Sequence, residues 1–173
     1  MGGAVSSSVL AGLFAGCRAT PGAYTPQTLT ADQHELVATV AELIIPATDT
    51  PGARSAGVHG FIDQMLTRGY TPEERDHFLA GLADLDARAS GGSGFLAASP
   101  EAQTEILTTL EAEAREARRS GDGPPPFFHM MKELTLTGYY TSEVGATQEL
   151  QYVHVAGSYN GDVPLSEAGR AYS

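Results

Sequence analysis

Three helix-start signals, each followed by apolar residues at helical spacing, constrain the fold of this chain more than any other feature. Thr30-Ala31-Asp32-Gln33 and Thr71-Pro72-Glu73-Glu74 are capping boxes, in which the Thr hydroxyl and the Gln or Glu side chain satisfy backbone amides at the start of a helix. A third start, Ser99-Pro100-Glu101, follows a Gly-rich break at 90–94. These signals predict three helices, beginning near Thr30, Thr71 and Ser99.

The apolar residues of these helices recur three and four residues apart, the spacing that places side chains on one face of an α-helix. Two further helices are predicted, at 58–68 with closure at Gly69, and from Pro126 to Gly138. Pro46 stops the first helix, and turn residues predict an ordered loop at 46–57. The predicted inner faces are Leu36, Val37, Val40, Leu43 and Ile44; Phe78, Leu79, Leu82 and Leu85; Ile106, Leu107, Leu110 and Ala114; and Phe127, Phe128, Met131 and Leu134. The predicted fold class is all-α, a compact bundle of about five helices over residues 30–138.

The composition fits one small domain with a substantial core. Apolar residues make up 42% of the 173 residues and charged residues 18%, so the chain can bury a core and is not compositionally disordered. The net charge of −11 would repel a phosphate backbone, so no nucleic-acid partner is expected. The sequence contains no apolar run of about 18 residues, the length at which a membrane-spanning helix is predicted.

Residues 1–17 resemble an export signal that ends in a lipoprotein cleavage box. The segment is uncharged and rich in small and apolar residues, and the only cysteine follows Leu13-Phe14-Ala15-Gly16 directly. Cys17 is therefore the predicted lipidation site, with a chance thiol as the alternative. Because an export signal needs a positive start and Met1-Gly2-Gly3 offers none, we expect the natural start to lie upstream. Residues 18–29 are the expected linker, and the expected location is the periplasm, tethered to the membrane through the lipid.

Residues 139–173 differ in character from the predicted helices. They hold five of the seven tyrosines, few aliphatic residues and several glycines, and only Gln151–Val155 alternate like a short strand. Tyr is amphipathic and enriched at protein interfaces. We therefore expect an extended, Tyr-rich C-terminal tail that packs either over a partner or back over its own helices. Its tyrosines are Tyr139, Tyr140, Tyr152, Tyr159 and Tyr172.

No constellation in the sequence predicts catalysis, a cofactor or a metal in this chain. His34-Glu35 begins like a zinc-protease motif, but the position of its second histidine is Ala38. His59 and Asp63 lie four residues apart and could ligate a metal, although two ligands alone favour a surface or capping role. Ser93 lies between glycines in a flexible joint rather than at a strand-to-helix elbow. The other histidines are scattered at His77, His129 and His154. The basic helix end with Arg115, Arg118 and Arg119 favours a solvated terminus over an anion site.

Two segments of the chain resemble a known family. The first is 41–53 with Ala56-Gly57-Val58, and the second is 134–145, which reads Leu-Thr-Leu-Thr-Gly-Tyr-Tyr-Thr-Ser-Glu-Val-Gly. Together with Gly161-Asp162-Val163-Pro164 they resemble the gluconate 2-dehydrogenase subunit 3 family, over about Thr30 to Pro164. The resemblance implies the small subunit of a periplasmic sugar or sugar-acid dehydrogenase, with FAD in a large subunit and often haem c in a cytochrome c partner. Members typically carry a twin-arginine signal that also exports the large subunit, and no arginine pair is seen in the signal-like segment 1–17.

The family offers no catalytic residues to carry over, but the two matching loops, 46–57 and 137–145, are expected to make partner contacts. The predicted interface residues are Pro46, Asp49, Thr50, Pro51, Tyr139, Tyr140, Thr141, Glu143, Tyr152 and Tyr159.

Three hypotheses follow from the sequence. The first is a non-catalytic accessory subunit that assists the folding, export and stability of a flavoprotein. The second is an independent exported helical lipoprotein that binds a small molecule between its helices. The third is an enzyme that uses Asp49, Asp63 or His59.

Overall fold

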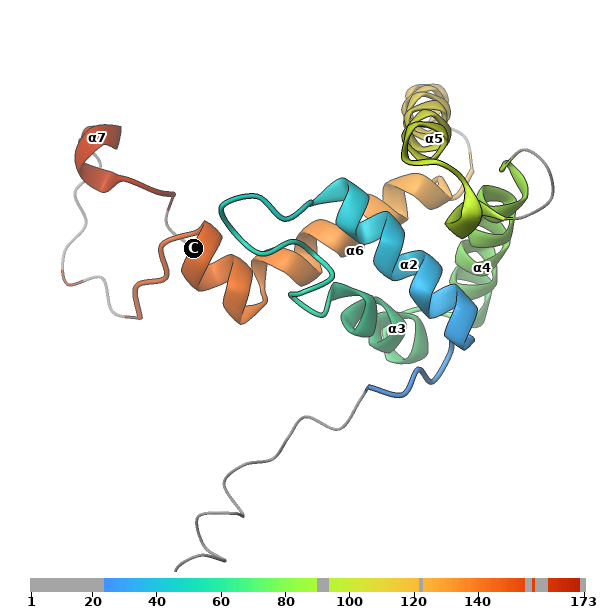
Figure 1. Ribbon diagram of the computed structural model, residues 1–173, viewed down its shortest axis with the longest axis horizontal. Coiled ribbons are helices and arrows are strands. Elements are labelled where there is room, and N and C mark those ends of the chain that lie inside the picture. Colours follow the sequence, from blue (N-terminus) through green and yellow to red (C-terminus); the bar gives the residue numbers. More distant parts are fainter. Residues whose placement is uncertain (1–23, 90–93, 122, 155–156, 158–161, 172–173) are drawn as a thin grey trace, which may run out of the picture.

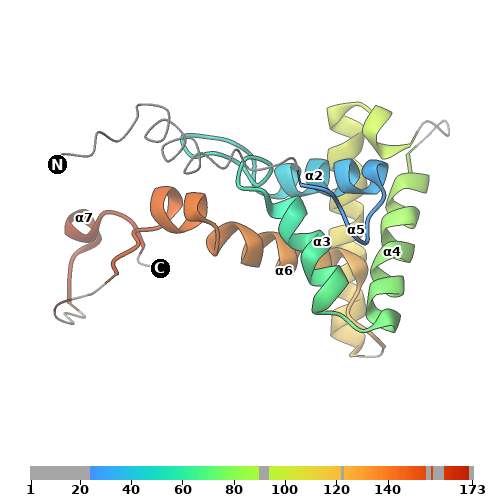
Figure 2. The ribbon, with the colours of Figure 1, turned by 90° about the horizontal axis from the view of Figure 1, so that it is seen from below.

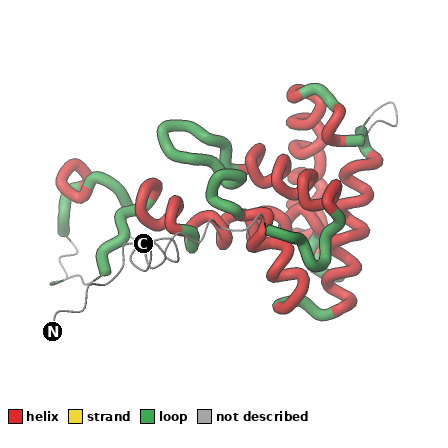
Figure 3. The backbone as a smooth tube through the Cα atoms, turned by 60° about the horizontal axis from the view of Figure 1, so that its bottom comes forward, coloured by secondary structure: helices red, strands yellow, loops and turns green. Residues whose placement is uncertain are grey.

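The structure, a computed structural model, describes residues 24–89, 94–121, 123–154, 157 and 162–171. Over these residues the chain forms helices and loops and no strand, so the predicted all-α fold is confirmed (Figure 3). The helical elements are α2 (Ala31–Ile44), α3 (Val58–Arg68), α4 (Pro72–Ala87), the 3-10 helix η1 (Phe95–Ala97), α5 (Pro100–Ser120), α6 (Phe127–Tyr140), the π-helical turn η2 (Gly145–Glu149) and α7 (Leu165–Ala168). The predictions for Cys17, Ser93, Val155, Tyr159 and Tyr172 lie outside the described residues.

The helix-start signals act as predicted. The Thr30 hydroxyl accepts a hydrogen bond from the Gln33 amide while the Gln33 side chain accepts one from the Thr30 amide, and Thr71 and Glu74 repeat this arrangement at the start of α4. Ser99 caps α5 through the amide of Ala102. These local bonds satisfy amides that have no partner inside the helix, which is why the helices begin at these residues.

Helix α6 is the centre of the bundle. It packs against α2, α3, α4 and α5, and in Figure 1 it crosses behind α2. In Figure 2 its second half projects away from the end of the molecule where α4 and α5 stand. None of the described helices is long and apolar enough to cross a bilayer. The largest fully buried side chains are Tyr139, Phe78, Phe95, Ile62, Leu66, Leu82, Leu85, Met131, Val37, Val40 and Val58, together with Thr135.

The prediction that the last helix ends at Gly138 is wrong. Helix α6 continues to Tyr140, and the φ angle of Gly138 is not positive. Gly138 is buried beneath Phe61 of α3, where an added Cβ would lie 2.7 Å from the ring carbon Cδ1. The glycine therefore allows α3 and α6 to approach closely and does not serve as a left-handed helix cap.

The segment after α6 is less extended than predicted. Tyr139 and Tyr140 belong to α6, and the chain then turns into η2. The predicted strand at 151–155 is wrong for its described part, because Gln151 makes one bridge, donating from its amide to the Ala171 carbonyl at 2.7 Å, and residues 152–154 join no ladder. Residues 152–154 are exposed, and a single bridged pair of strands is at best marginally stable in water.

Candidate functional site

The loop between α2 and α3, residues 45–57, is closed at its base by the last turn of α2. The Glu42 carboxylate accepts hydrogen bonds from the amides of Ala47 at 3.0 Å and Arg54 at 2.8 Å. The Ala53 amide donates to the Ile45 carbonyl at 2.9 Å. Gly52 lies directly against the Glu42 carboxylate, where a Cβ would come within 2.6 Å of the Ala47 nitrogen. The loop therefore has a fixed shape that requires glycine at this position.

The far limb of the loop is attached to the outer face of α2 by Arg54. Its guanidinium donates to the Glu35 carboxylate at 2.9 Å and to the Thr39 hydroxyl at 2.8 Å. The bond from Arg54 holds the pKa of Glu35 below its ordinary value, although partial burial opposes this effect. Because both side chains are largely exposed, the ion pair contributes at most about 1 kcal/mol.

The C-terminal half of α6 supports the same loop from beneath. The Tyr139 hydroxyl donates to the Pro51 carbonyl at 2.8 Å, and the Thr50 hydroxyl donates to the Glu149 carboxylate at 2.8 Å. The turn after α6 is fixed by Ser142, whose hydroxyl donates to the Tyr139 carbonyl at 2.6 Å and accepts from the Gly145 amide at 3.0 Å. Loop 45–57 and residues 139–149 therefore lie side by side, although about 90 residues separate them in sequence. We call this surface the loop–η2 surface.

A comparison with protein families matches this region. The family model for gluconate 2-dehydrogenase subunit 3 covers residues 31–157, which include both halves of the loop–η2 surface. The chain belongs to the gluconate 2-dehydrogenase subunit 3 family. Its family name makes it a component of a multi-subunit dehydrogenase. Neither the curated proteins nor the solved structures include one that matches the chain.

The predicted interface residues of this subunit 3 chain divide by burial. Exposed residues are Pro46, Asp49, Tyr140, Thr141, Glu143 and Tyr152. Thr50 and Pro51 are partly buried through their bonds to Glu149 and Tyr139. Tyr139 is 1% exposed and its ring faces its own loop. Its assignment as a contact residue is therefore corrected: Tyr139 supports the surface from inside.

Two exposed apolar residues lie near this surface. Leu136 on α6, which sequence reasoning missed, is 42% exposed. Leu43 was predicted on the inner face of the first helix, and this prediction is wrong, because Leu43 near the end of α2 is 38% exposed and does not join the core. Leu136 lies one helical turn after Lys132, which pairs with Glu111 of α5 at 2.9 Å, and one turn before Tyr140. Leu136 and Tyr140, four residues apart and both exposed, thus form an apolar stripe on the second half of α6. The four-residue spacing of Leu136 and Tyr140 is the sequence signal from which this stripe could have been predicted.

The Asp63 carboxylate of the pair His59 and Asp63 is engaged by other donors in this fold. Asp63 is fully buried and accepts hydrogen bonds from the Tyr24 hydroxyl at 2.6 Å and from the amides of Gln27 at 2.8 Å, Thr28 at 3.0 Å and Leu29 at 2.8 Å. Burial excludes the surface role expected for Asp63, whereas the binding of backbone amides just before α2 agrees with the capping alternative. The segment that it binds, 24–29, is the described part of the expected linker. No group of three or more potential metal ligands occurs within the described ranges.

The remaining polar candidates also have local partners. His77 bonds to the Pro125 carbonyl at 2.9 Å, His129 pairs with Glu133 at 3.1 Å, and His154 contacts the Tyr152 hydroxyl at 3.1 Å. At the basic end of α5, Glu111 pairs with both Arg115 at 3.2 Å and Lys132 at 2.9 Å. The Glu111 carboxylate offsets part of the positive charge, and Arg115, Arg118 and Arg119 are exposed, in agreement with a solvated helix terminus.

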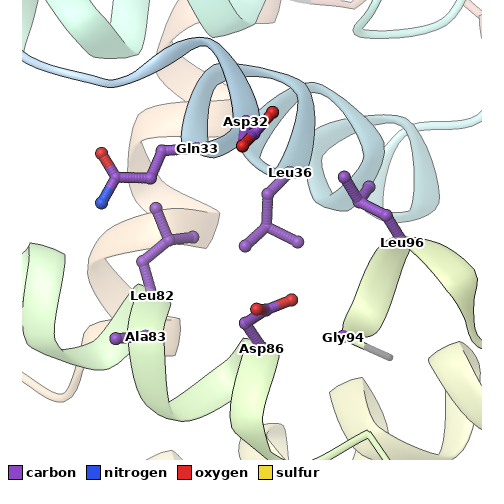
Figure 4. Close-up of a pocket in the computed structure, with 8 residues that line it drawn as sticks. All are labelled: Asp32, Gln33, Leu36, Leu82, Ala83, Asp86, Gly94 and Leu96. Carbon is purple, nitrogen blue, oxygen red and sulfur yellow. The ribbon is translucent and has the colours of Figure 1, made fainter. Parts of the chain in front are cut away.

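One hollow between α2 and α4 has a volume of about 320 Å³ (Figure 4). Leu36 and Leu82 face each other across it, and Asp32 and Asp86 line its rim. Asp86 already accepts a hydrogen bond from the Phe95 amide at 2.8 Å. The hollow is at the lower end of the size range for small-molecule sites.

Proposed function

We propose that this chain is the non-catalytic small subunit of an exported FAD-dependent (GMC-type) sugar or sugar-acid dehydrogenase. In this proposal it docks on the large flavoprotein subunit through the loop–η2 surface and the Leu136–Tyr140 stripe. It assists the folding, export and stability of that subunit, FAD is held by the large subunit, and a cytochrome c with haem c accepts the electrons.

The observation that carries the proposal is a rigid loop that is exposed beside an apolar stripe. Ordering a loop costs about 1–2 kcal/mol of backbone entropy per residue, and here Glu42, Arg54 and Tyr139 all supply bonds that offset it. The tip that they hold in place, Pro46 to Asp49, remains exposed. A pre-ordered loop loses less entropy when a partner binds it, and this increases the affinity for that partner.

The chemistry of the exposed residues fits a protein partner. Tyr140 and Tyr152 are 39% and 56% exposed, and Leu136 lies beside Tyr140 on α6. Tyr side chains bury a large area at a small entropy cost and are enriched among the residues that dominate binding energy. Burial of this stripe by the large subunit would remove the apolar surface that the single chain leaves in water.

The test is co-purification of a tagged chain expressed with its genomic neighbours. We expect the large subunit to elute with it and to bring flavin absorbance. Leu136→Asp should weaken the complex, since loss of a central contact costs about 2 kcal/mol or roughly a 30-fold change in affinity. Leu96→Asp is the matched control, because Leu96 is also 42% exposed but lies on η1, at the other end of the molecule.

Two results would contradict the proposal. One is a tagged chain that elutes alone and without flavin. The other is equal weakening by Leu136→Asp and Leu96→Asp, which would remove any special role of the stripe. Sugar oxidation by the purified chain alone would instead support the enzyme hypothesis.

The hollow between α2 and α4 favours a second candidate, an independent exported lipoprotein that binds a small molecule. This alternative predicts a stable monomer whose melting temperature rises on addition of the ligand. Filling of the hollow by Ala83→Leu, at an exposed position of its lining, would abolish such a shift without affecting co-purification.

A further inference from the structure

Two partly buried histidines from different helices touch at the interface between α2 and α3. The rings of His34 and His59 meet edge to face, with centroids 4.7 Å apart. One nitrogen of each ring, Nε2 of His34 and Nδ1 of His59, is shielded from solvent and has no hydrogen-bond partner. A buried polar atom without a partner is costly, so this contact is a weak point in the packing.

The histidine pair lies beneath the segment that leads into α2. The ring of Tyr24 stacks on His34 at 5.6 Å and lies over Gly60, at ordinary van der Waals distance from an added Cβ. The Tyr24 hydroxyl and three following amides bind Asp63, one turn after His59 on α3. Residues 24–29 are therefore attached to α3 by Asp63 on one side and to α2 by the His34 ring on the other (Figure 2, dark blue).

A positive charge on this pair is disfavoured by its position. His34 lies in the first turn of α2 and His59 is the second residue of α3, so both rings are near the positive ends of helix dipoles. The groups that face the pair are Glu35 of α2, Arg54 of the loop, Tyr24 of the segment, and Asp63 on α3 itself. Burial lowers the pKa of His59, His34 and Arg54 lower it further, and Glu35 opposes them.

We propose that His34 and His59 form a proton-sensitive latch that releases residues 24–29 from α2 and α3 under mildly acidic conditions. When the segment is released, the His59 ring is hydrated and takes up a proton near the ordinary histidine pKa of about 6.5. In the docked state this proton is disfavoured, so docking loses stability as the pH falls below this value. Above about pH 7 His59 is neutral in both states and the latch is closed.

The size of the response follows from the proton that docking excludes from His59. Over one pH unit below about 6.5, the ratio of released to docked segments rises by up to about tenfold. Asp63 does not produce this response, because its hydrogen bonds hold its pKa below the ordinary value against the effect of burial. Its carboxylate thus stays charged over the range in which His59 titrates.

Release changes the reach of the chain. Six extended residues span up to about 20 Å, so a lipid anchor at Cys17 would allow the helical domain to stand that much farther from the membrane. This consequence depends on the proposed anchor, whereas the latch itself does not.

The test is amide hydrogen exchange by NMR on the full chain between pH 7.5 and 5. The protection factors of Thr28 and Leu29, corrected for the intrinsic pH dependence of exchange, should fall at least tenfold, while that of Met131 in the core of α6 should not change. The double variant His34→Gln, His59→Gln should lose this response. His154→Gln is the control, since His154 contacts Tyr152 far from the segment, and it should behave as the natural chain does.

Equal protection of Thr28 and Leu29 at pH 7 and pH 5 in the natural chain would overturn the proposal. So would an undiminished response in the double variant. If the double variant does not fold, the comparison with Met131 in the natural chain still decides, because global unfolding would expose both regions together.

Discussion

Replacement of Asp63 by Asn tests how strongly one buried carboxylate holds the N-terminal segment. The carboxylate oxygen Oδ1 accepts from Thr28 and Leu29, and Oδ2 accepts from Tyr24 and Gln27. An Asn side chain has one acceptor oxygen, so two of the four donors lose their partner and face an NH₂ group instead. The substitution keeps the volume of the side chain and changes only its hydrogen bonding.

The expected cost follows from these bonds. Two hydrogen bonds to a charged group contribute about 3–6 kcal/mol together. Removal of a charge from a fully buried site returns part of this, because the carboxylate is no longer desolvated. Residues 24–29 can also detach and become hydrated, so the loss cannot exceed the free energy with which this segment docks. We therefore expect Asp63→Asn to lower the free energy of unfolding by about 2–4 kcal/mol.

Urea unfolding followed by circular dichroism measures this change. Asp49→Asn is the control, because Asp49 is exposed and accepts one bond from its neighbour Thr48, and it should change stability by less than about 0.5 kcal/mol. The pH dependence gives a second check. Since the folded-state pKa of Asp63 is lowered, its contribution is present above the ordinary Asp pKa and is lost as the pH falls through the folded value.

The difference between the natural chain and Asp63→Asn should therefore shrink in acid. A loss of stability below about 1 kcal/mol at pH 7, or a difference that stays constant to low pH, would show that the carboxylate does not hold the segment.

Two further substitutions test how the loop–η2 surface is held. Gly52→Ala should destabilise the chain by about 1–3 kcal/mol, because the new Cβ would displace the Glu42 carboxylate from the amides that it binds; thermal unfolding measures this, and an unchanged melting temperature would contradict the packing described. Tyr139→Phe removes the bond to the Pro51 carbonyl and should cost about 0.5–1.5 kcal/mol, with faster amide exchange in the loop; equal exchange rates in the variant and the natural chain would show that the hydroxyl does not hold it.

The helices were predictable from the sequence because their signals are local. A capping box involves residues three apart, and an apolar stripe is repeated every three to four residues, so both can be recognised before any tertiary contact is known. The end of α6 was not predictable in this way. Gly138 near a helix end fits either a left-handed cap or a close approach of another helix, and only the packing of Phe61 from α3 decides between them.

The attachment of residues 24–29 has no sequence signature. Asp63 binds backbone amides about 35 residues away, and every residue except proline carries such an amide. The same holds for Glu42, whose partners are the amides of Ala47 and Arg54. Acidic residues in helices suggest solvated faces, so the two carboxylates that organise the loops could not be distinguished from the others by composition.

The segments that resemble the family can be divided by the role of each residue. Glu42, Gly52 and Tyr139 fix the shape of loop 45–57 through contacts within the chain. The stability of the fold is therefore sufficient to explain why these residues are needed. The fold does not explain Leu136 and Tyr140 in the same way, because both side chains remain substantially exposed. Substitutions in the first group should therefore lower stability and partner binding together, whereas Leu136→Asp should lower binding while the melting temperature stays near that of the natural chain. Only the second outcome identifies a residue that touches the partner, and a stripe whose loss acts solely through stability would be part of the scaffold.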